Sequence, residues 1–155
     1  MKKYIGVKLV DAEPGEAPAK LGLPYGTQGM DVVYRDGYKS WCPKNIFEAQ
    51  NVGIGKHNTV TQEDVDNMIG DVLVKTIGGK TTFVQVMLRN GFTLEETSSC
   101  VDPANYNEGM GVDICMAKIK DKIWYLLEFL LQSALYGFNH VKPNPLLKTT
   151  ERPGL

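Results

Sequence analysis

The stretch NGFTLEETSSCVDPANY, residues 90–106, decides the fold of this chain. The pair Asn90-Gly91 is a turn signal, because both residues tolerate a positive φ, and it lies between two strand-like apolar runs. A loop rich in hydroxyl, carboxylate and amide groups then runs from Ser98 to Tyr106. The long apolar run around Trp124 that follows predicts a helix. Strand, polar loop and apolar helix together predict an α+β fold for this half of the chain.

Three antiparallel strands are expected before the polar loop. Residues 72–77 lead through two glycines into residues 81–88, and the Asn90-Gly91 turn starts a third strand over residues 92–97. A two-residue loop at this turn would pair Leu88 with Thr93 and Val86 with Glu95. That register places Val84, Val86 and Leu88 on one face. The opposite face would then carry Phe83, Met87, Phe92 and Leu94, so we expect both faces to be at least partly covered.

Two helices are expected around this sheet. Thr61-Gln62-Glu63-Asp64 has capping-box-like spacing and predicts a short helix up to about Ile69. A long helix is predicted from about Asn107 to Leu135, because apolar residues recur there at three- and four-residue steps. This stripe comprises Val112, Met116, Ile119, Ile123, Leu127, Leu130 and Ala134.

The long helix is apolar over more of its circumference than one sheet can cover. The stripe is widened by Trp124, Leu126, Phe129 and Leu131. A helix of this kind must bury its remaining apolar side chains against a partner. Two partners remain open: the same helix in a second subunit, since twofold assemblies are the commonest, or the N-terminal part of the chain.

The N-terminal part predicts a small β module. We expect a first strand from Tyr4 to Val10, a Pro- and Gly-rich loop over residues 11–29, and a hairpin over residues 31–41 around Asp36-Gly37. A short helix or turn should follow Pro43. Residues 51–58 are the candidate linker. The expected organisation is a β-rich module over residues 1–50, an α+β domain over 59–138 and a loosely ordered tail over 139–155.

Composition excludes several classes of protein. The chain has 155 residues, 43% of them apolar, which is enough to build a core. The 17 basic residues nearly balance the 18 acidic ones and form no dense run, so neither DNA nor RNA is an expected partner. The longest apolar run, residues 123–131, is shorter than the roughly 20 residues of a membrane span, so no membrane is expected. No signal peptide is predicted, and reduced thiols in a cytosolic protein are expected for Cys42, Cys100 and Cys115.

Catalytic machinery is not predicted, and neither a cofactor nor a metal is expected. His57 and His140 lie in no nucleophile or metal pattern. Cys100 has no base specified near it, and a buried apolar role is favoured for this thiol. Glu95 and Glu96 cannot form a facing acid pair, because adjacent strand residues point to opposite faces.

Binding of a small polar ligand accounts better for the polar loop. Backbone N–H groups at a helix N-terminus can hold anions, hydroxyl and amide groups can contact ribose or base edges, aromatic rings can stack and cations can meet phosphates. The candidate ligand-binding residues are Arg89, Phe92, Ser98, Ser99, Asp102, Asn105, Tyr106, Lys118 and Lys122. Structural alternatives stay open. Asp102-Pro103 also suits a helix entry, Phe92 also suits a core position, and Lys118 and Lys122 also suit a solvated helix ridge.

These residues resemble a known family. Residues 61–65, the Asn90-Gly91-Phe92 turn, residues 98–106 and Lys122-Ile123-Trp124 look like a widespread family of small phage accessory proteins. That family is similar to, and includes, the first-described Thoeris anti-defence proteins, which sequester cyclic ADP-ribose-type immune signals. The resemblance covers roughly residues 60 to 136.

The resemblance implies a signal sponge in the cytoplasm of the bacterial host. Such a protein is a non-enzymatic oligomer that binds glycocyclic ADP-ribose between a sheet edge and the C-terminal helix, and cyclic oligonucleotides at a separate subunit interface. One departure concerns residues 115–121, which contain no Arg, so Arg89 or the lysines would replace a helix arginine as the phosphate contact. An alternative function is a phage accessory protein that inhibits a host protein through its apolar helix and aromatic surface.

Overall fold

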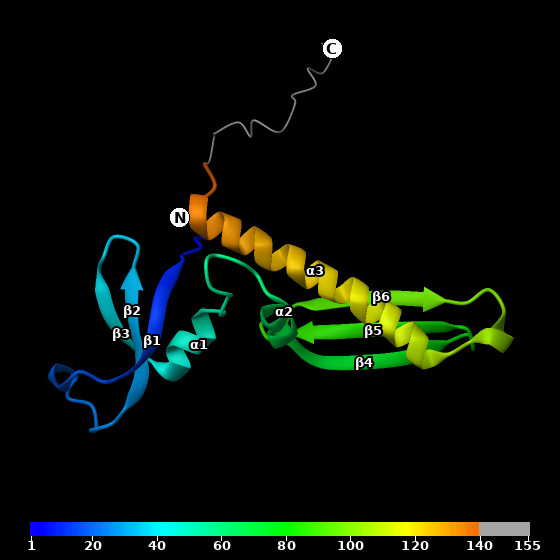
Figure 1. The fold of residues 1–155 in the computed structure, drawn as a ribbon, viewed down its shortest axis with the longest axis horizontal. Coiled ribbons are helices and arrows are strands. Elements are labelled where there is room, and N and C mark those ends of the chain that lie inside the picture. The colour runs from blue at the N-terminus through cyan, green and yellow to red at the C-terminus, as the bar shows by residue number, and fades with distance from the viewer. Residues whose placement is uncertain (140–155) are drawn as a thin grey trace, which may run out of the picture.

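Two three-stranded antiparallel sheets and one long C-terminal helix make up the protein (Figure 1), which confirms the α+β fold class. The computed structural model describes residues 1–139, so the predicted tail lies outside the described residues from His140 onward. In chain order the elements are β1 (Val10–Glu16), the 3-10 helix η1 (Ala19–Leu21), β2 (Gln28–Tyr34), β3 (Lys39–Pro43), α1 (Lys44–Gln50), α2 (Gln62–Met68), β4 (Ile69–Ile77), β5 (Thr81–Leu88), β6 (Thr93–Ser99), the 3-10 helix η2 (Pro103–Asn105) and α3 (Glu108–Tyr136).

The first strand lies later in the sequence than predicted. β1 begins at Val10, where the predicted strand ended, and it occupies part of the segment expected to be a loop. Pro14 lies within β1 and has no N–H group to donate. The sheet order is β1-β2-β3, however, and an edge strand tolerates a missing donor. The prediction of a strand over Tyr4 to Val10 is therefore wrong, because Pro14 and Gly15, residues typical of loops, belong to an edge strand here.

A three-residue turn forms each of the two hairpins at the predicted turn signals. In the β5–β6 hairpin the N–H of Leu88 donates to the carbonyl of Phe92 at 2.7 Å, and Gly91 has a φ of 84°. The side chain of Asn90 accepts from the N–H of Phe92 at 3.1 Å. Such a turn needs a left-handed residue at its third position, which is why glycine follows Asn90. The β2–β3 hairpin repeats this arrangement with Tyr34, Asp36, Gly37 and Tyr38.

The extra loop residue shifts the register of β6 by one. Val86 pairs with Leu94, whereas a two-residue loop would have paired it with Glu95. Since alternate strand residues point to opposite faces, this shift moves Leu94 to the face of Val86. The prediction that Phe92 and Leu94 share the face of Met87 is therefore wrong. Phe92 belongs to the turn and, with Leu94, lies beside α3.

The core of the second domain is the contact between β5 and α3. Alternate residues of β5 are buried, and every fourth residue of α3 is buried opposite them. Figure 1 shows α3 crossing the sheet diagonally over β5 and β6. The core side chains include Val84, Val86, Leu88, Cys115, Ile119, Ile123 and Leu127, with Val65 and Met68 of α2 closing one end.

The N-terminal end of α3 approaches β5 very closely at Gly111. A Cβ atom added to Gly111 would lie 2.1 Å from the Oγ1 atom of Thr82, whose side chain is fully buried. Only a residue without a Cβ allows the helix to lie this near the strand. The polar loop before α3 is held against the sheet as a result.

The predicted capping box fixes α2. The side chain of Thr61 accepts from the N–H of Asp64, and the Asp64 carboxylate accepts from the N–H of Thr61 at 2.7 Å. The same carboxylate accepts from the N–H of Gly55 at 2.9 Å, which joins the segment before α2 to the helix. Lys120 of α3 lies 2.8 Å from Asp66 and links the two helices.

The second half of α3 extends beyond the sheet and keeps an apolar surface. The predicted core stripe is buried from Ile119 to Leu127, but Leu130 is 41% exposed. Tyr125 is 74% exposed and Phe129 is 59% exposed, so the N-terminal module does not cover these rings. Self-association through this surface stays a prediction. None of the described helices is long and apolar enough to cross a membrane.

Arg35 of the β2–β3 turn joins the N-terminal module to α3. Its Nη1 atom donates to the carbonyl of Leu135 at 2.7 Å and to that of Ala134 at 3.5 Å. The last turn of α3 contains no basic residue of its own. A cation at this position complements the partial negative charge of the helix C-terminus.

The contact at Gly111 gives a stability prediction. Gly111→Ala should lower the free energy of unfolding by about 1–3 kcal/mol through overpacking against Thr82, despite the better helix propensity of Ala. Gly109→Ala, in the same turn of α3, is the matched control, because its added Cβ would meet only the Asn107 side chain, at 3.3 Å. Urea unfolding should show the loss in the first variant alone. Equal stabilities of both variants would show that the close approach is not maintained.

Candidate functional site

The predicted polar corner exists at the junction of β5, β6, η2 and the start of α3. It encloses a hollow of about 130 Å³. Four of the predicted ligand residues line it, namely Ser98, Ser99, Asn105 and Tyr106. The remaining lining residues are Thr82, Cys100, Asn107, Met110, Gly111 and Ile114. The close contact between α3 and β5 therefore also builds this corner.

The phenol of Tyr106 is already engaged in holding the corner together. Its hydroxyl lies 2.7 Å from the Oγ1 atom of Thr76 in β4 and 3.0 Å from that of Thr82 in β5. Thr76 also donates to the carboxylate of Glu108 in the first turn of α3. This network joins two strands, the loop and the helix. The Tyr106 hydroxyl thus has a structural role, although the residue also lines the hollow.

The other polar side chains of the loop differ in whether they already form hydrogen bonds within the protein. The Ser99 hydroxyl pairs with Thr81 at 2.7 Å. Asp102 caps η2 by accepting from the N–H of Ala104 at 2.9 Å and does not line the hollow, so the helix-entry alternative holds for it. Within residues 1–139, the Ser98 hydroxyl and the Asn105 amide make no hydrogen bond. Among the predicted ligand residues that line the hollow, these two have polar groups available to a ligand.

Lys118 and Lys122 hold α3 to the free edge of β6. Lys122 Nζ lies 2.6 Å from Glu96 Oε1 and 3.2 Å from the carbonyl of Glu95. Lys118 Nζ lies 3.9 Å from Glu96 Oε2 and 3.5 Å from the carbonyl of Thr97. The Glu96 side chain is only 19% exposed. The Lys122 hydrogen bond, together with the charges of both lysines, holds the pKa of Glu96 below its usual range. The expected solvated ridge is therefore an ion-pair cluster.

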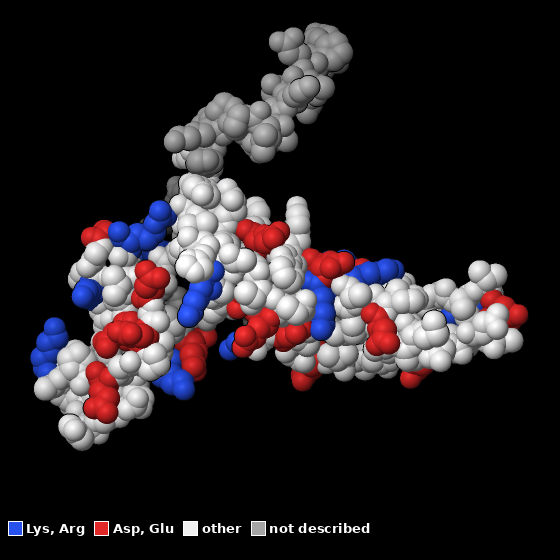
Figure 2. Space-filling model, in the orientation of Figure 1, with Lys and Arg blue, Asp and Glu red and all other residues white. Residues whose placement is uncertain are grey.

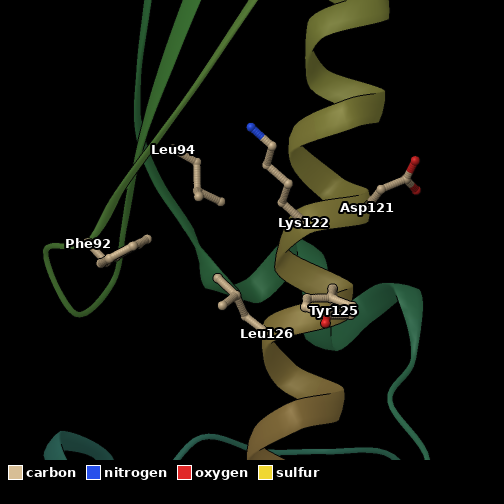
Figure 3. Close-up of a pocket in the computed structure, with 6 residues that line it drawn as sticks. All are labelled: Phe92, Leu94, Asp121, Lys122, Tyr125 and Leu126. Atoms are coloured by element: carbon tan, nitrogen blue, oxygen red, sulfur yellow. The ribbon is translucent and has the colours of Figure 1, made fainter. Parts of the chain in front are cut away.

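A larger apolar groove opens where the β5–β6 turn meets α3. Its volume is about 430 Å³. Figure 3 shows Phe92 and Leu94 on the strand side, and Lys122, Tyr125 and Leu126 on the helix side, while the carboxylate of Asp121 points away from the strands. Two exposed aromatic rings, Phe92 and Tyr125, thus border a cavity next to a lysine.

The apolar groove, the lysine cluster and the polar corner follow one another along the line where β6 meets α3, which we call the β6–α3 seam. Leu94, Glu96 and Ser98 alternate on the helix-facing side of β6. At about 3.3 Å per residue, the distance from Leu94 to Ser98 along the strand is about 13 Å. The predicted ligand residues are therefore brought to one seam but not to one pocket. Arg89 lies in the exposed turn next to Phe92.

Sequence reasoning missed several residues of the seam. Tyr125 and Leu126 follow Lys122 by three and four residues, and this helical spacing could have placed them beside that lysine. Glu96 could have been assigned to the helix-facing side only with the correct register of β6. Buried Cys115 is not a nucleophile candidate, because burial raises the pKa of its thiol. Among residues 1–139, no group of three or more His, Cys, Asp or Glu side chains could hold a metal ion.

A comparison with family models found one match. Residues 60–135, from the start of α2 to the end of α3, match the model of the phage protein family described as N4 Gp49/phage Sf6 gene 66. The matched segment, just under half of the chain, is similar to that phage protein family. Neither a curated protein nor a solved structure matches the chain. The family domain contains the whole seam, whereas the β1–β3 module lies outside the matched residues.

The ion-pair cluster of the family domain predicts a pH dependence. Because the folded-state pKa of Glu96 is lowered, its contribution to stability is present above the ordinary glutamate pKa and is lost as the pH falls through the folded value. Glu96→Gln should flatten the loss of stability on acidification between about pH 5 and pH 3. Glu95→Gln, on the open face, is the control and should keep the wild-type profile. The role of Glu96 would be contradicted if the free energy of unfolding fell equally steeply with decreasing pH in wild type and in Glu96→Gln.

Proposed function

We propose that the protein is a phage anti-defence protein that binds and sequesters a cyclic nucleotide-type immune signal without cleaving it. Glycocyclic ADP-ribose is the proposed ligand, and cyclic oligonucleotides are further candidates. The observation that carries the proposal is the order of chemical groups along the β6–α3 seam. Aromatic rings, lysines, and free hydroxyl and amide groups succeed one another along this seam, in which Leu94 and Ser98 lie about 13 Å apart.

Each part of the seam suits one part of such a ligand. Phe92 and Tyr125 offer ring faces for a base beside an apolar groove. Lys118 and Lys122 supply the charges for phosphates. Ser98 and Asn105 can bond to ribose hydroxyls or base edges.

Cavity size favours the groove as the site of the base. A volume of about 430 Å³ falls within the range of about 300–1,000 Å³ that small-molecule sites occupy. The polar corner, at about 130 Å³, is too small to enclose a nucleotide by itself. A ligand reaching the corner would place only a polar edge there.

Glu96 occupies the lysines in the absence of ligand. A phosphate group would compete with this carboxylate for Lys118 and Lys122, because both ion pairs of Glu96 use the Nζ atoms that a phosphate would need. Binding of the ligand would therefore break the ion pairs of Glu96. Ion pairs at a partly exposed site contribute only modestly to stability. Removal of the Glu96 charge should leave both lysines free for the ligand.

Self-association through α3 is part of the proposal. The exposed Tyr125 and Phe129 lie on the half of the helix that extends past the sheet, and Tyr125 also borders the groove. A second copy packed on this surface would cover the rings and deepen the groove. The cytoplasm of the bacterial host is the proposed location, since the signal is expected there.

Direct binding tests the proposal. Calorimetry with glycocyclic ADP-ribose should show saturable binding, and heating the complex should return the ligand chemically intact. Recovery of a degraded product would identify an enzyme. If neither glycocyclic ADP-ribose nor any of a panel of cyclic oligonucleotides gives a heat of binding, the proposal of signal sequestration is rejected.

Variants of the seam locate the site. Asn105→Ala and Arg89→Ala should each weaken binding about five- to tenfold, the loss of one polar contact to the ligand. Glu96→Gln should tighten it, because the lysines no longer have a competing carboxylate. Glu95→Gln is the matched control with unchanged affinity. If affinity is unchanged in all four variants, the ligand binds elsewhere.

Inhibition of a host protein is the second candidate function. It is favoured by the mostly uncharged surface of the C-terminal half of α3 in Figure 2, where Phe129 and Leu130 are 59% and 41% exposed. Phe138, just after the helix, is 62% exposed. Aromatic residues are common anchors of protein interfaces. Under this second candidate, Phe129→Ser should abolish a stoichiometric complex with a host protein. Saturable binding of the nucleotide signal by a wild-type protein that forms no host complex would favour the first candidate.

A further inference from the structure

The outer edge of β4 is exposed along a strand of nine residues. β4 is the border strand in the order β4-β5-β6, and Figure 1 shows no element beside its outer edge. Val72, Leu73 and Ile77 are 46%, 42% and 52% exposed. The strand contains no proline. A long apolar edge of this kind is a template for pairing with another strand. The opposite edge, β6, is covered by Lys118 and Lys122.

The hydrogen-bonding groups of this edge can be assigned by alternation. Leu88 donates its N–H to Phe92, so the even-numbered residues of β5 bond to β6 and the odd-numbered ones to β4. In the observed register Leu73 is paired with Gln85, so its backbone groups face β5. The N–H and C=O groups of Val72 and Val74 consequently point outward from the sheet.

The sequence of this edge is complementary to itself in the antiparallel direction. It reads Asp71-Val72-Leu73-Val74-Lys75. Around a twofold axis at Leu73, Asp71 comes opposite Lys75 of the second strand, Val72 opposite Val74, and Leu73 opposite itself. Opposite charges at directly facing positions stabilise antiparallel pairs.

The two charges of this segment have no ion-pair partner among residues 1–139. Asp71 and Lys75 are exposed, and neither forms an ion pair in the described part of the chain. By strand alternation, Leu73 and Lys75 lie on the sheet face that α3 does not cover. Asp71 directly precedes the regular part of β4, within the register shift between Ile69 and Val72. Pairing with a second β4 would therefore give Asp71 and Lys75 ion-pair partners. It would also give hydrogen-bond partners to the outward N–H and C=O groups of both strands.

We propose that β4 pairs antiparallel with β4 of a second copy of this chain, around a twofold axis at Leu73, to form a continuous six-stranded sheet. Val72 and Val74 of the two chains exchange N–H···O=C bonds on both sides of the axis. Leu73 faces its symmetry mate in a pair without hydrogen bonds, where side chains are closest. Two Asp71–Lys75 ion pairs flank this contact.

Charge selects this register over its neighbours. An axis at Val74 would place Leu73 opposite Lys75 and Asp71 opposite Ile77, which leaves both charges unpaired.

The contact between the two β4 strands is smaller than a standard protein interface, so we expect reversible association with a Kd of roughly micromolar order. It uses neither the apolar half of α3 nor the β6–α3 seam. The pairing is thus independent of the proposed ligand site.

Cysteine cross-linking of the full-length protein tests the geometry. Leu73→Cys should form a 73–73 disulfide between chains under mild oxidation, because Cα atoms in such a pair lie about 4.5 Å apart, within disulfide range. Thr97→Cys, an exposed residue of the same face on β6, is the matched control and should not cross-link to itself. Peptide mass spectrometry identifies the linked residues. Absence of the 73–73 link, or equal yields in both variants, would overturn the proposal.

Charge reversal tests the register. Asp71→Lys and Lys75→Asp should each weaken dimerisation about tenfold or more, because each places two like-charge pairs across the axis. The double variant restores both pairs with the signs exchanged and should recover wild-type affinity in sedimentation equilibrium. Asp113→Lys, an exposed change of equal charge on α3, should have no effect. Failure of the double variant to recover would overturn the proposed pairing.

Discussion

The packing of α3 across β5 is the constraint on which the family domain depends. Every fourth residue of the helix is buried against alternate residues of the strand, and Gly111 brings the start of the helix into contact with Thr82. This contact fixes the height of the helix above the sheet. It also fixes the polar corner at one end of the seam and the apolar groove at the other, since both lie between β6 and α3. The candidate site is therefore a consequence of the core.

Much of this fold could be predicted because the signals are local. The capping box at Thr61, the strand over residues 81–88 and the long helix each follow from residues close together in the sequence. Two errors have physical causes. β1 contains Pro14, which an edge strand tolerates but a sequence pattern assigns to a loop. The Asn90-Gly91 signal was correct, but the loop has three residues, and turn length is decided by a glycine φ that the sequence alone does not show.

The site was predicted only in part, because its residues meet through the register and through helix packing. The one-residue shift brings Leu94 and Glu96 to the helix-facing side, which no composition argument could have assigned. Tyr106 is a candidate ligand residue by sequence, but its hydroxyl bonds to Thr76 and Thr82 inside the corner. The partners of this hydroxyl are threonines on strands 24 and 30 residues away in sequence. Long-range pairing of this kind is not visible in a local pattern.

Residue-resolved hydrogen exchange on the full chain is the most direct test of the central claim that β5 and α3 form one cooperative unit. The buried core predicts that amides of residues 84–88 and 115–127 share the slowest exchange and respond together to added urea. The β1–β3 module, where Val32 is the buried apolar side chain, should exchange faster. Rapid exchange along residues 115–127 while β5 stays protected would contradict the account, because the helix would then not depend on the sheet.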